Sequence, residues 1–161
     1  EGKRIAETLM MDFHRKYNVD TRIARIFNTY GPQMDKTDGR VISNFINQSL
    51  RHENITIYGD GSQTRSFCYI TDQINGLVKL MNSDCISPIN IGNSNELTVK
   101  QVAEKIIELS QSQSKLIYLP LPKDDPTNRK PDITKANMIL NWDPYVKFEE
   151  GLLLTIDYFN C

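Results

Sequence analysis

The sequence predicts an α/β fold in which helices alternate with the strands of a parallel sheet. Residues 2–17 place apolar side chains at helical spacing, and a β-branched strand pattern follows directly at 21–27. A helix that runs closely into a strand is half of a βαβ unit, which implies a parallel sheet with further strands earlier in the fold. Strand and helix patterns then alternate again between residues 55 and 119.

The first helix, expected over residues 2–17, carries a wide apolar face. Its apolar side chains are those of Ala6, Met10, Phe13 and Tyr17, with Ile5 and Leu9 widening the stripe. A face of this width indicates burial on more than one side. The chain begins at Glu1 with the helix already under way, so the sequence is expected to be a fragment of a longer protein.

The segments expected to face a ligand lie in the middle of the chain. The strand at 21–27 runs into a polar loop, 28–40, and open α/β sheets bind their ligands beyond the carboxyl ends of such strands. The elements expected next are a helix over 41–50, a strand over 55–58, a Gly59-Asp60-Gly61 turn, a polar loop containing Arg65, and a strand over 67–70.

Helix caps, apolar spacing and prolines predict the remaining elements. Thr71 is a favourable N-cap residue for a helix over 72–82, and Thr98 is one for the helix that follows it. The last expected elements are strands at 88–92 and 115–119 and helices at 134–140 and 148–159, with Trp142 between these helices as a core anchor.

The composition argues against several classes of partner. The chain is 39% hydrophobic and 24% charged with a formal net charge of −1. It therefore lacks the basic excess typical of proteins that bind nucleic acid or membrane surfaces, and we expect neither partner for this segment. No apolar run approaches the length of a membrane span.

Neither a metal site nor a disulfide framework is expected. Cys68, Cys85 and Cys161 are far apart and form no CxxC pair, and Cys68 has the apolar neighbours of a core residue. The remaining metal-ligating residue types are expected to be solvated, namely His14, His52 and the Asp124-Asp125 pair.

Three arginines, Arg40, Arg65 and Arg129, follow turns or lie in loops near expected strand ends. A guanidinium binds phosphate or carboxylate oxygens through two parallel hydrogen bonds, and the glycines of the 59–61 turn let the backbone approach a ligand closely. These residues favour a diphosphate or carboxylate ligand. An ordinary hairpin over residues 55–70 with a surface arginine remains the alternative interpretation.

Several motifs together resemble one enzyme family. They are EGKR at 1–4, RIFNTYGP at 25–32, DGR at 38–40, YGDGSQTRSF at 58–67 and RKPD at 129–132. Their combination is similar to the extended short-chain dehydrogenase/reductases that act on nucleotide sugars, and within them to the UDP-glucuronic acid decarboxylases, or UDP-xylose synthases. The resemblance covers essentially all 161 residues. Related epimerases and dehydratases share RIFNTYGP and YGDG, so EGKR and RKPD narrow the assignment.

The resemblance implies the carboxyl-terminal part of an extended Rossmann-type (NAD-dependent epimerase/dehydratase) fold with a small substrate-binding lobe. Residues 1–30 and 71–95 would belong to the nucleotide-binding sheet and its helices, and residues 31–70 and 96–161 would form the substrate-binding lobe. The first helix would lie in the interface of a homodimer. The compartment stays open between the cytoplasm and the Golgi lumen.

The resemblance also implies catalytic and cofactor-binding residues. Lys3 would be the lysine of a Tyr-x-x-x-Lys pair whose tyrosine would precede Glu1. It would favour the phenolate form of that tyrosine and hold the nicotinamide ribose of NAD, with Thr29 near the nicotinamide. Arg129 would anchor the substrate carboxylate and is a candidate proton donor, although an always-charged guanidinium suits the first role better.

The substrate would be a UDP-sugar. By the same resemblance, Asn28 would bind its diphosphate region, and Arg40 would contact the nucleotide of either the substrate or NAD. The residues expected to wrap the UDP are Thr56, Tyr58, Gln63 and Arg65, with Arg65 on the phosphates.

The implied reaction is the NAD-dependent decarboxylation of UDP-glucuronate to UDP-xylose. The sugar C4 hydroxyl is oxidised, carbon dioxide leaves because the resulting ketone accepts the electrons, and the retained NADH reduces the ketone. This sequence contains neither the GxxGxxG turn nor the catalytic tyrosine, so residues 1–161 alone are expected to be inactive. Two alternatives remain, a nucleotide-sugar 4-epimerase or 4,6-dehydratase and a non-catalytic nucleotide-sugar-binding module.

Overall fold

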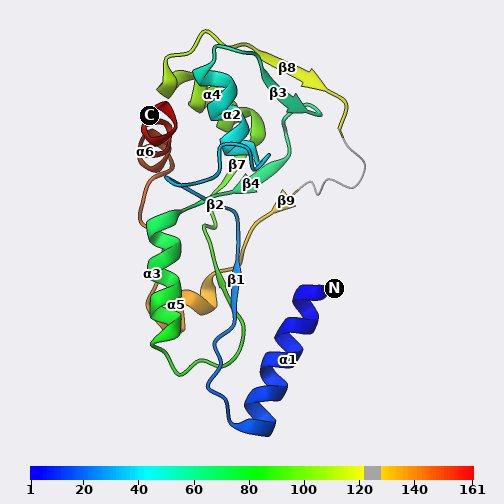
Figure 1. The fold of residues 1–161 in the computed structure, drawn as a ribbon, viewed down its shortest axis with the longest axis vertical. Helices are drawn as coiled ribbons and strands as arrows, with labels where there is room; N and C mark the ends of the chain where they lie inside the picture. Colours follow the sequence, from blue (N-terminus) through cyan, green and yellow to red (C-terminus); the bar gives the residue numbers. More distant parts are fainter. Residues whose placement is uncertain (122–127) are drawn as a thin grey trace.

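The computed structural model describes residues 1–121 and 128–161, and only the backbone of residues 128 and 129 (Figure 1). The helices are α1 (Gly2–Tyr17), α2 (Val41–Leu50), α3 (Ile70–Met81), α4 (Val99–Ser110), α5 (Thr134–Leu140) and α6 (Phe148–Asn160). The strands are β1 (Ala24–Ile26), β2 (Thr29–Tyr30), β3 (Ile55–Tyr58), β4 (Thr64–Ser66), β5 (Cys68–Tyr69), β6 (Ile89–Ile91), β7 (Glu96–Thr98), β8 (Leu116–Leu119) and β9 (Asn128–Arg129).

One half of the molecule, at the bottom of Figure 1, is built on the parallel pair β1 and β6. The strands expected near 21–27 and 88–92 are thus present, and their parallel pairing agrees with the parallel sheet that the sequence predicts. Helices α3 and α5 pack on β6 and bury a core that includes Leu80, Ile89 and Ile91. Trp142 is the expected anchor of this core, since its ring is buried and its Nε1 donates to the carbonyl of Asp72 at 3.1 Å.

The other half is built on the parallel pair β3 and β8, with α2, α4 and α6 to the left of the pair in Figure 1. Its core contains Ile46, Ile55, Ile57 and Ile106, each fully buried. Thr98 caps α4 as expected, in a capping box with Gln101. The boundary between the two expected lobes stays a prediction. Helix α5 packs with β1 and β6, although it follows the second half in the chain.

A three-stranded sheet with the order β7-β4-β9 lies between the two halves (Figure 1). Strand β4 pairs antiparallel with β7 and parallel with β9, whereas β3 pairs with β8. The alternative of an ordinary hairpin over 55–70 is therefore wrong. The expectation that Arg65 lies in a polar loop is also wrong, because Arg65 is the middle residue of a strand with partners on both sides.

Helix α3 begins earlier than its sequence indicates. The expected strand over 67–70 ends at Tyr69, which is also the N-cap residue, so Thr71 is not the cap and lies inside the helix. Tertiary contacts outweigh local capping here. The Asp72 carboxylate, fully buried in the first turn, accepts hydrogen bonds from the backbone of Tyr145 and Val146 at 3.1 and 2.9 Å. Burial raises the pKa of Asp72, and these two donors oppose that shift.

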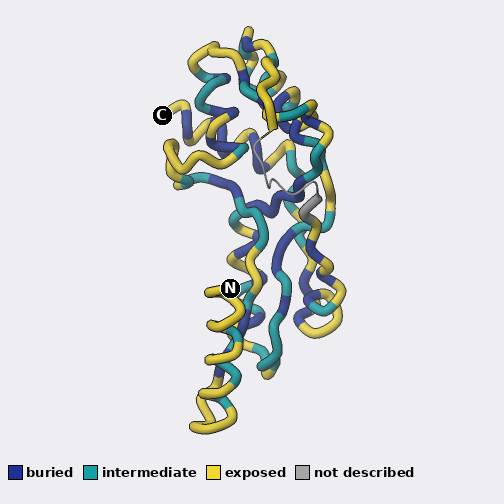
Figure 2. The backbone as a smooth tube through the Cα atoms, turned by 90° about the vertical axis from the view of Figure 1, so that its right-hand side faces the viewer, coloured by how far each residue is buried: buried dark blue, intermediate teal, exposed yellow. Residues whose placement is uncertain are grey.

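The apolar face of α1 is exposed in this chain, against the expectation that it is buried on more than one side. Ile5, Leu9, Phe13 and Tyr17 are all at least half exposed, and Figure 2 shows most of the helix in the exposed colour. The helix contacts β1 through the ion pair of Glu7 with Arg25, whose two hydrogen bonds are both 2.7 Å long. Among the described residues, no helix is both long and apolar enough to cross a membrane.

Gly76 lets α3 pack closely on β6, and its replacement tests this contact. A Cβ atom at this position would lie 2.6 Å from Ile91 Cγ2 and 2.9 Å from Trp142 Cε2. We expect Gly76→Ala to lower the free energy of unfolding by about 1–3 kcal/mol through overpacking, although alanine is the better helix former. Urea denaturation of the whole protein measures the change. The control is Gly2→Ala, because a Cβ atom there meets nothing within 4 Å. An unchanged midpoint for Gly76→Ala would contradict the packing described.

Candidate functional site

A cavity of about 780 Å³ lies beyond the carboxyl end of β1. Its apolar wall includes Phe27, Ile42 and Phe67. The polar residues that line it are Lys3, Asn28, Thr29, Arg40 and Arg65, all of which the sequence nominated. The structure therefore brings together the start of α1, the end of β1, the start of α2 and the strand β4.

A second cavity of about 370 Å³ adjoins the first and shares Gly39, Val41 and Arg65 with it. The nominated residues Thr56, Tyr58 and Gln63 line this smaller cavity. Arg65 lies where the two cavities meet. A long ligand that fills both cavities would pass this guanidinium near its middle.

Arg65 is held rigidly, because β4 has hydrogen-bonded neighbours on both sides. The residue is 8% exposed, and its Nη1 donates to the carbonyl of Thr64 at 2.8 Å. A guanidinium can donate two parallel hydrogen bonds to phosphate or carboxylate oxygens, so the position of Arg65 between two cavities suits contact with an anionic ligand. In the parallel ladder, the Arg129 backbone is in register with that of Arg65. The two arginines thus occupy neighbouring strands rather than loops, which corrects the expectation for both.

In the segment 27–30, the polar side chains of Asn28 and Thr29 line the larger cavity, and Tyr30 packs in the core. Asn28 donates from Nδ2 to the carbonyl of Ser66 at 3.3 Å, and Thr29 donates from Oγ1 to the carbonyl of Phe27 at 3.0 Å. Tyr30 turns into the core instead, where its hydroxyl donates to the carbonyl of Phe148 at 3.1 Å. The buried Tyr30 side chain therefore anchors the end of this segment, and the two preceding residues, Asn28 and Thr29, are held at the cavity.

The turn at 59–61 lies between two residues that line the smaller cavity, Tyr58 and Gln63. Gly59 and Gly61 have φ values of 73° and 77°, which favour glycine. Between them, Asp60 accepts from the hydroxyl and the backbone of Ser62 at 2.6 and 2.9 Å, and these hydrogen bonds lower the pKa of Asp60. Gln63 then donates from Nε2 to the carbonyl of Tyr58 at 2.7 Å. The turn thus places two nominated residues, Tyr58 and Gln63, side by side.

Arg40 sits at the N-terminus of α2 and is held by Asp38. The carboxylate of Asp38 accepts from the backbone of Arg40 at 3.0 Å and lies 3.3 Å from its Nε. It also accepts from the hydroxyl of Ser43. The Arg40 side chain remains 68% exposed at the edge of the larger cavity, where it is accessible to a ligand.

Two residues that the sequence did not nominate, Asn44 and Gln48, also line the smaller cavity. Gln48 accepts from the backbone of Thr56 and donates to its hydroxyl, both at 3.2 Å. The sequence feature that could have identified them is their spacing of four residues on α2, which places both side-chain amides on one face of the helix.

The remaining candidates lie away from these cavities. His14 is half-buried and pairs with the carbonyl of Val19 at 2.8 Å, and exposed His52 lies 3.2 Å from the hydroxyl of Ser112. Within the described part of the chain, no group of three or more His, Cys, Asp or Glu side chains is placed to hold a metal ion. The Asp124-Asp125 pair lies outside the described residues.

Parallel strands with a ligand-sized cavity beyond a carboxyl end are typical of Rossmann-type α/β proteins. Residues 1–92 match the NAD dependent epimerase/dehydratase family. The chain belongs to this family.

Curated relatives narrow the comparison further. The chain is 53% identical to UDP-glucuronic acid decarboxylase 5 of Arabidopsis thaliana, over 99% of its own length and 47% of the relative's. It is 51% identical to UDP-glucuronic acid decarboxylase 1 of Danio rerio, over 99% of its own length and 38% of the relative's. The chain therefore spans about half the length, or less, of the curated relatives that it matches.

Solved structures show the same fold at lower identity. UDP-glucose 4-epimerase from Thermotoga maritima superposes with a TM-score of 0.91 at 32% identity, over 95% of this chain and 50% of the epimerase. UDP-glucuronic acid 4-epimerase from Bacillus cereus, in complex with UDP-glucuronic acid and NAD, superposes with a TM-score of 0.86 at 29% identity, over 94% and 49% of the two chains.

Cys68, which pairs with Thr29 in the strand ladder, is expected to be unreactive. Its side chain is fully buried, as the sequence predicted, and burial raises the pKa of its thiol to about 12. Alkylation requires the thiolate, so at pH 8 iodoacetamide should modify exposed Cys161 and spare Cys68 in the folded protein. Mass spectrometry locates the modified residue, and denatured protein serves as the control in which both react. Equal rates for the two thiols in the folded state would contradict the burial described.

Proposed function

We propose that the whole protein decarboxylates UDP-glucuronate to UDP-xylose with bound NAD. The observation that carries the proposal is the register of β4 and β9, in which the backbone of Arg129 pairs with that of Arg65, a residue that lines both cavities. UDP-glucuronate carries a diphosphate and a sugar carboxylate, so it calls for two separate cationic groups. The names of the curated relatives support the same substrate.

Each lining residue receives a role that suits its chemistry. Arg65 binds the diphosphate where the cavities meet, and the Asn28 amide donates to the same region. The nucleoside lies in the smaller cavity against Thr56, Tyr58 and Gln63. Arg40 contacts the nucleotide part of either the substrate or NAD.

The residues that face the larger cavity fit NAD. Lys3 supplies an ammonium donor and Thr29 lies close to Asn28 on the same wall, a set suited to ribose hydroxyls and the nicotinamide group. NAD, when bound, would supply the hydride acceptor and donor for the sugar C4 position. Lys3 also stabilises a neighbouring phenolate, which can take the proton of the C4 hydroxyl.

Arg129 anchors the sugar carboxylate in this proposal. The guanidinium stays charged at any relevant pH, so it binds the carboxylate well and is a poor proton donor. Carbon dioxide leaves from C5, and a proton takes its place there. Orientation of the carboxylate by a fixed cation favours that step over reduction without loss of carbon dioxide.

We also propose that two copies of the whole protein associate through α1. The exposed stripe of Ile5, Leu9, Phe13 and Tyr17 has the apolar character of a helical interface. We expect light scattering to give a dimer, and Leu9→Glu to shift the protein toward monomer. A wild-type monomer at micromolar concentration would contradict this proposal.

Incubation of the whole protein with UDP-glucuronate and NAD tests the proposed reaction. We expect release of carbon dioxide and formation of UDP-xylose without net consumption of NAD. UDP-galacturonate as the sole product would instead support a 4-epimerase, to which the Bacillus cereus structure lends weight. Binding of UDP-glucuronate without any product would support a non-catalytic binding module.

A further inference from the structure

The Glu96 carboxylate on β7 contacts both the central strand β4 and Lys130, the residue after β9. It lies on β7, opposite Ser66 of the central strand β4. Its Oε1 accepts a hydrogen bond from the hydroxyl of Thr64 on β4 at 2.7 Å, and its Oε2 lies 3.6 Å from Nζ of Lys130, the residue that follows β9. One side chain therefore contacts β4 and the residue that directly follows β9.

Strand β9 is one of the shortest strands, so a side-chain contact can help to hold it in place. It has two residues, so its ladder with β4 consists of two residue pairs. A ladder this short specifies its register weakly. On the carboxyl-terminal side, Asn90 donates from Nδ2 to the carbonyl of Asp132 at 2.9 Å. The contact of Glu96 with Lys130 fixes the chain two residues nearer to Arg129.

We propose that Glu96 is a positioning residue that holds β9 against β4 and thereby sets the place of Arg129 relative to Arg65. This inference rests on the proposed decarboxylation, because it gives Arg129 the carboxylate-binding role. Glu96 lines neither cavity, so it acts through Lys130 and Thr64 rather than on the substrate.

Such a residue affects turnover far more than stability. The two charged side chains are 29% and 55% exposed, and an ion pair with this exposure contributes little to folding. A displacement of about 1 Å at a reacting group, by contrast, can lower a rate on the order of a hundredfold. The combination of a small effect on unfolding and a large effect on turnover separates positioning from a general structural role.

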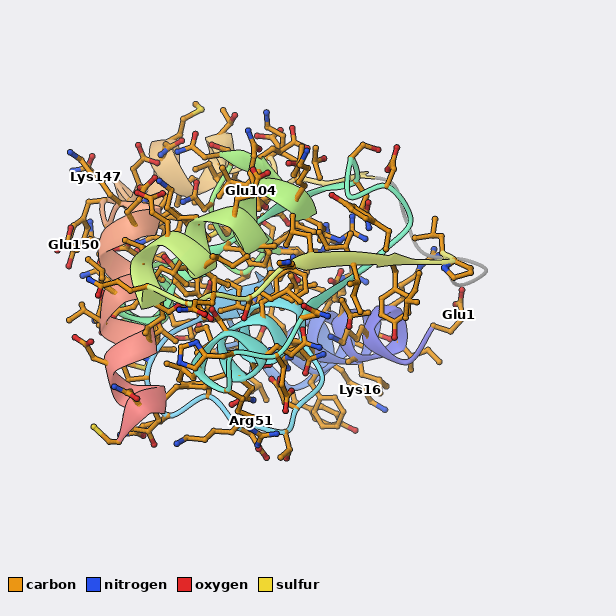
Figure 3. The ribbon with its side chains drawn as sticks, turned by 90° about the horizontal axis from the view of Figure 1, so that it is seen from above. Glu1, Lys16, Arg51, Glu104, Lys147 and Glu150 are labelled. Carbon is orange, nitrogen blue, oxygen red and sulfur yellow. The ribbon has the colours of Figure 1, made fainter. Side chains whose placement is uncertain are left out.

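The chain offers a matched control on α4. Glu104 pairs with Lys100 at 3.8 Å, and both side chains are about half exposed. Figure 3 places Glu104 on α4, far from Glu1 at the start of α1. Glu104→Gln removes the same charge from an ion pair that lies within a single helix.

The first experiment compares Glu96→Gln with Glu104→Gln in the whole protein. The amide oxygen of Glu96→Gln can still accept from Thr64, but the charge facing Lys130 is gone. We expect kcat for decarboxylation to fall roughly tenfold or more. The melting temperature and the Kd for UDP, which has no sugar carboxylate, should stay at wild-type values, and Glu104→Gln should change none of these quantities. Wild-type kcat for Glu96→Gln would overturn the inference.

A charge exchange gives the second test. Glu96→Lys alone should lose more activity than Glu96→Gln, because two ammonium groups then face each other. Combining it with Lys130→Glu should restore part of the lost kcat. Equal activity of the single and double variants, with lowered melting temperatures in both, would show a structural role and overturn the inference.

Different results would overturn the role of Glu96 and the proposed decarboxylation. An active wild type together with an unaffected Glu96→Gln variant overturns the role of Glu96 and leaves the decarboxylation standing. A wild type that forms no UDP-xylose overturns the decarboxylation and this inference with it.

Discussion

The candidate site depends on the strand pairing that flanks Arg65 on both sides. β4 is three residues long, yet its backbone bonds to β7 on one edge and to β9 on the other. A buried arginine on such a strand cannot move away from the point where the two cavities meet. Because β9 pairs with the same strand, the backbone of a second arginine is fixed beside the first. The position of Arg65 and of the Arg129 backbone thus follows from one ladder.

Tyr30 supports this arrangement from the core of the half that is built on β3 and β8. Its ring contacts those of Phe67, Tyr69 and Phe148, and burial raises the pKa of its hydroxyl. Gly151 leaves room for the cluster, since a Cβ atom there would lie 2.5 Å from the Tyr30 oxygen. The RIFNTYGP motif therefore combines two functions. Its tyrosine secures the core, and the preceding polar residues are held at the cavity.

Sequence periodicity predicted the long elements well. The helices α2, α5 and α6 begin and end within one residue of expectation, and the Thr98 cap has the predicted geometry. The strands β2, β4, β7 and β9 were missed, because two or three residues are too few to show alternation and depend on partners distant in the chain. The same limit explains why Arg65 was expected in a loop. Its sequence neighbours are polar, and only the pairing of β4 with β7 and β9 shows that it lies in a strand. Thr71 was misjudged because the buried contacts of Asp72, not a cap, fix the start of α3.

The nominated site residues were found largely through motif resemblance, and the structure places most of them at two adjoining cavities. Their roles remain proposals. The central claim is that Arg65 and Arg129 divide the substrate, one binding the diphosphate and the other the carboxylate. Calorimetric titration of the whole protein with UDP and with UDP-glucuronate tests it most directly. Arg65→Ala should weaken both ligands, whereas Arg129→Ala should weaken UDP-glucuronate and leave UDP unchanged. Equal losses for both ligands in both variants would contradict the division.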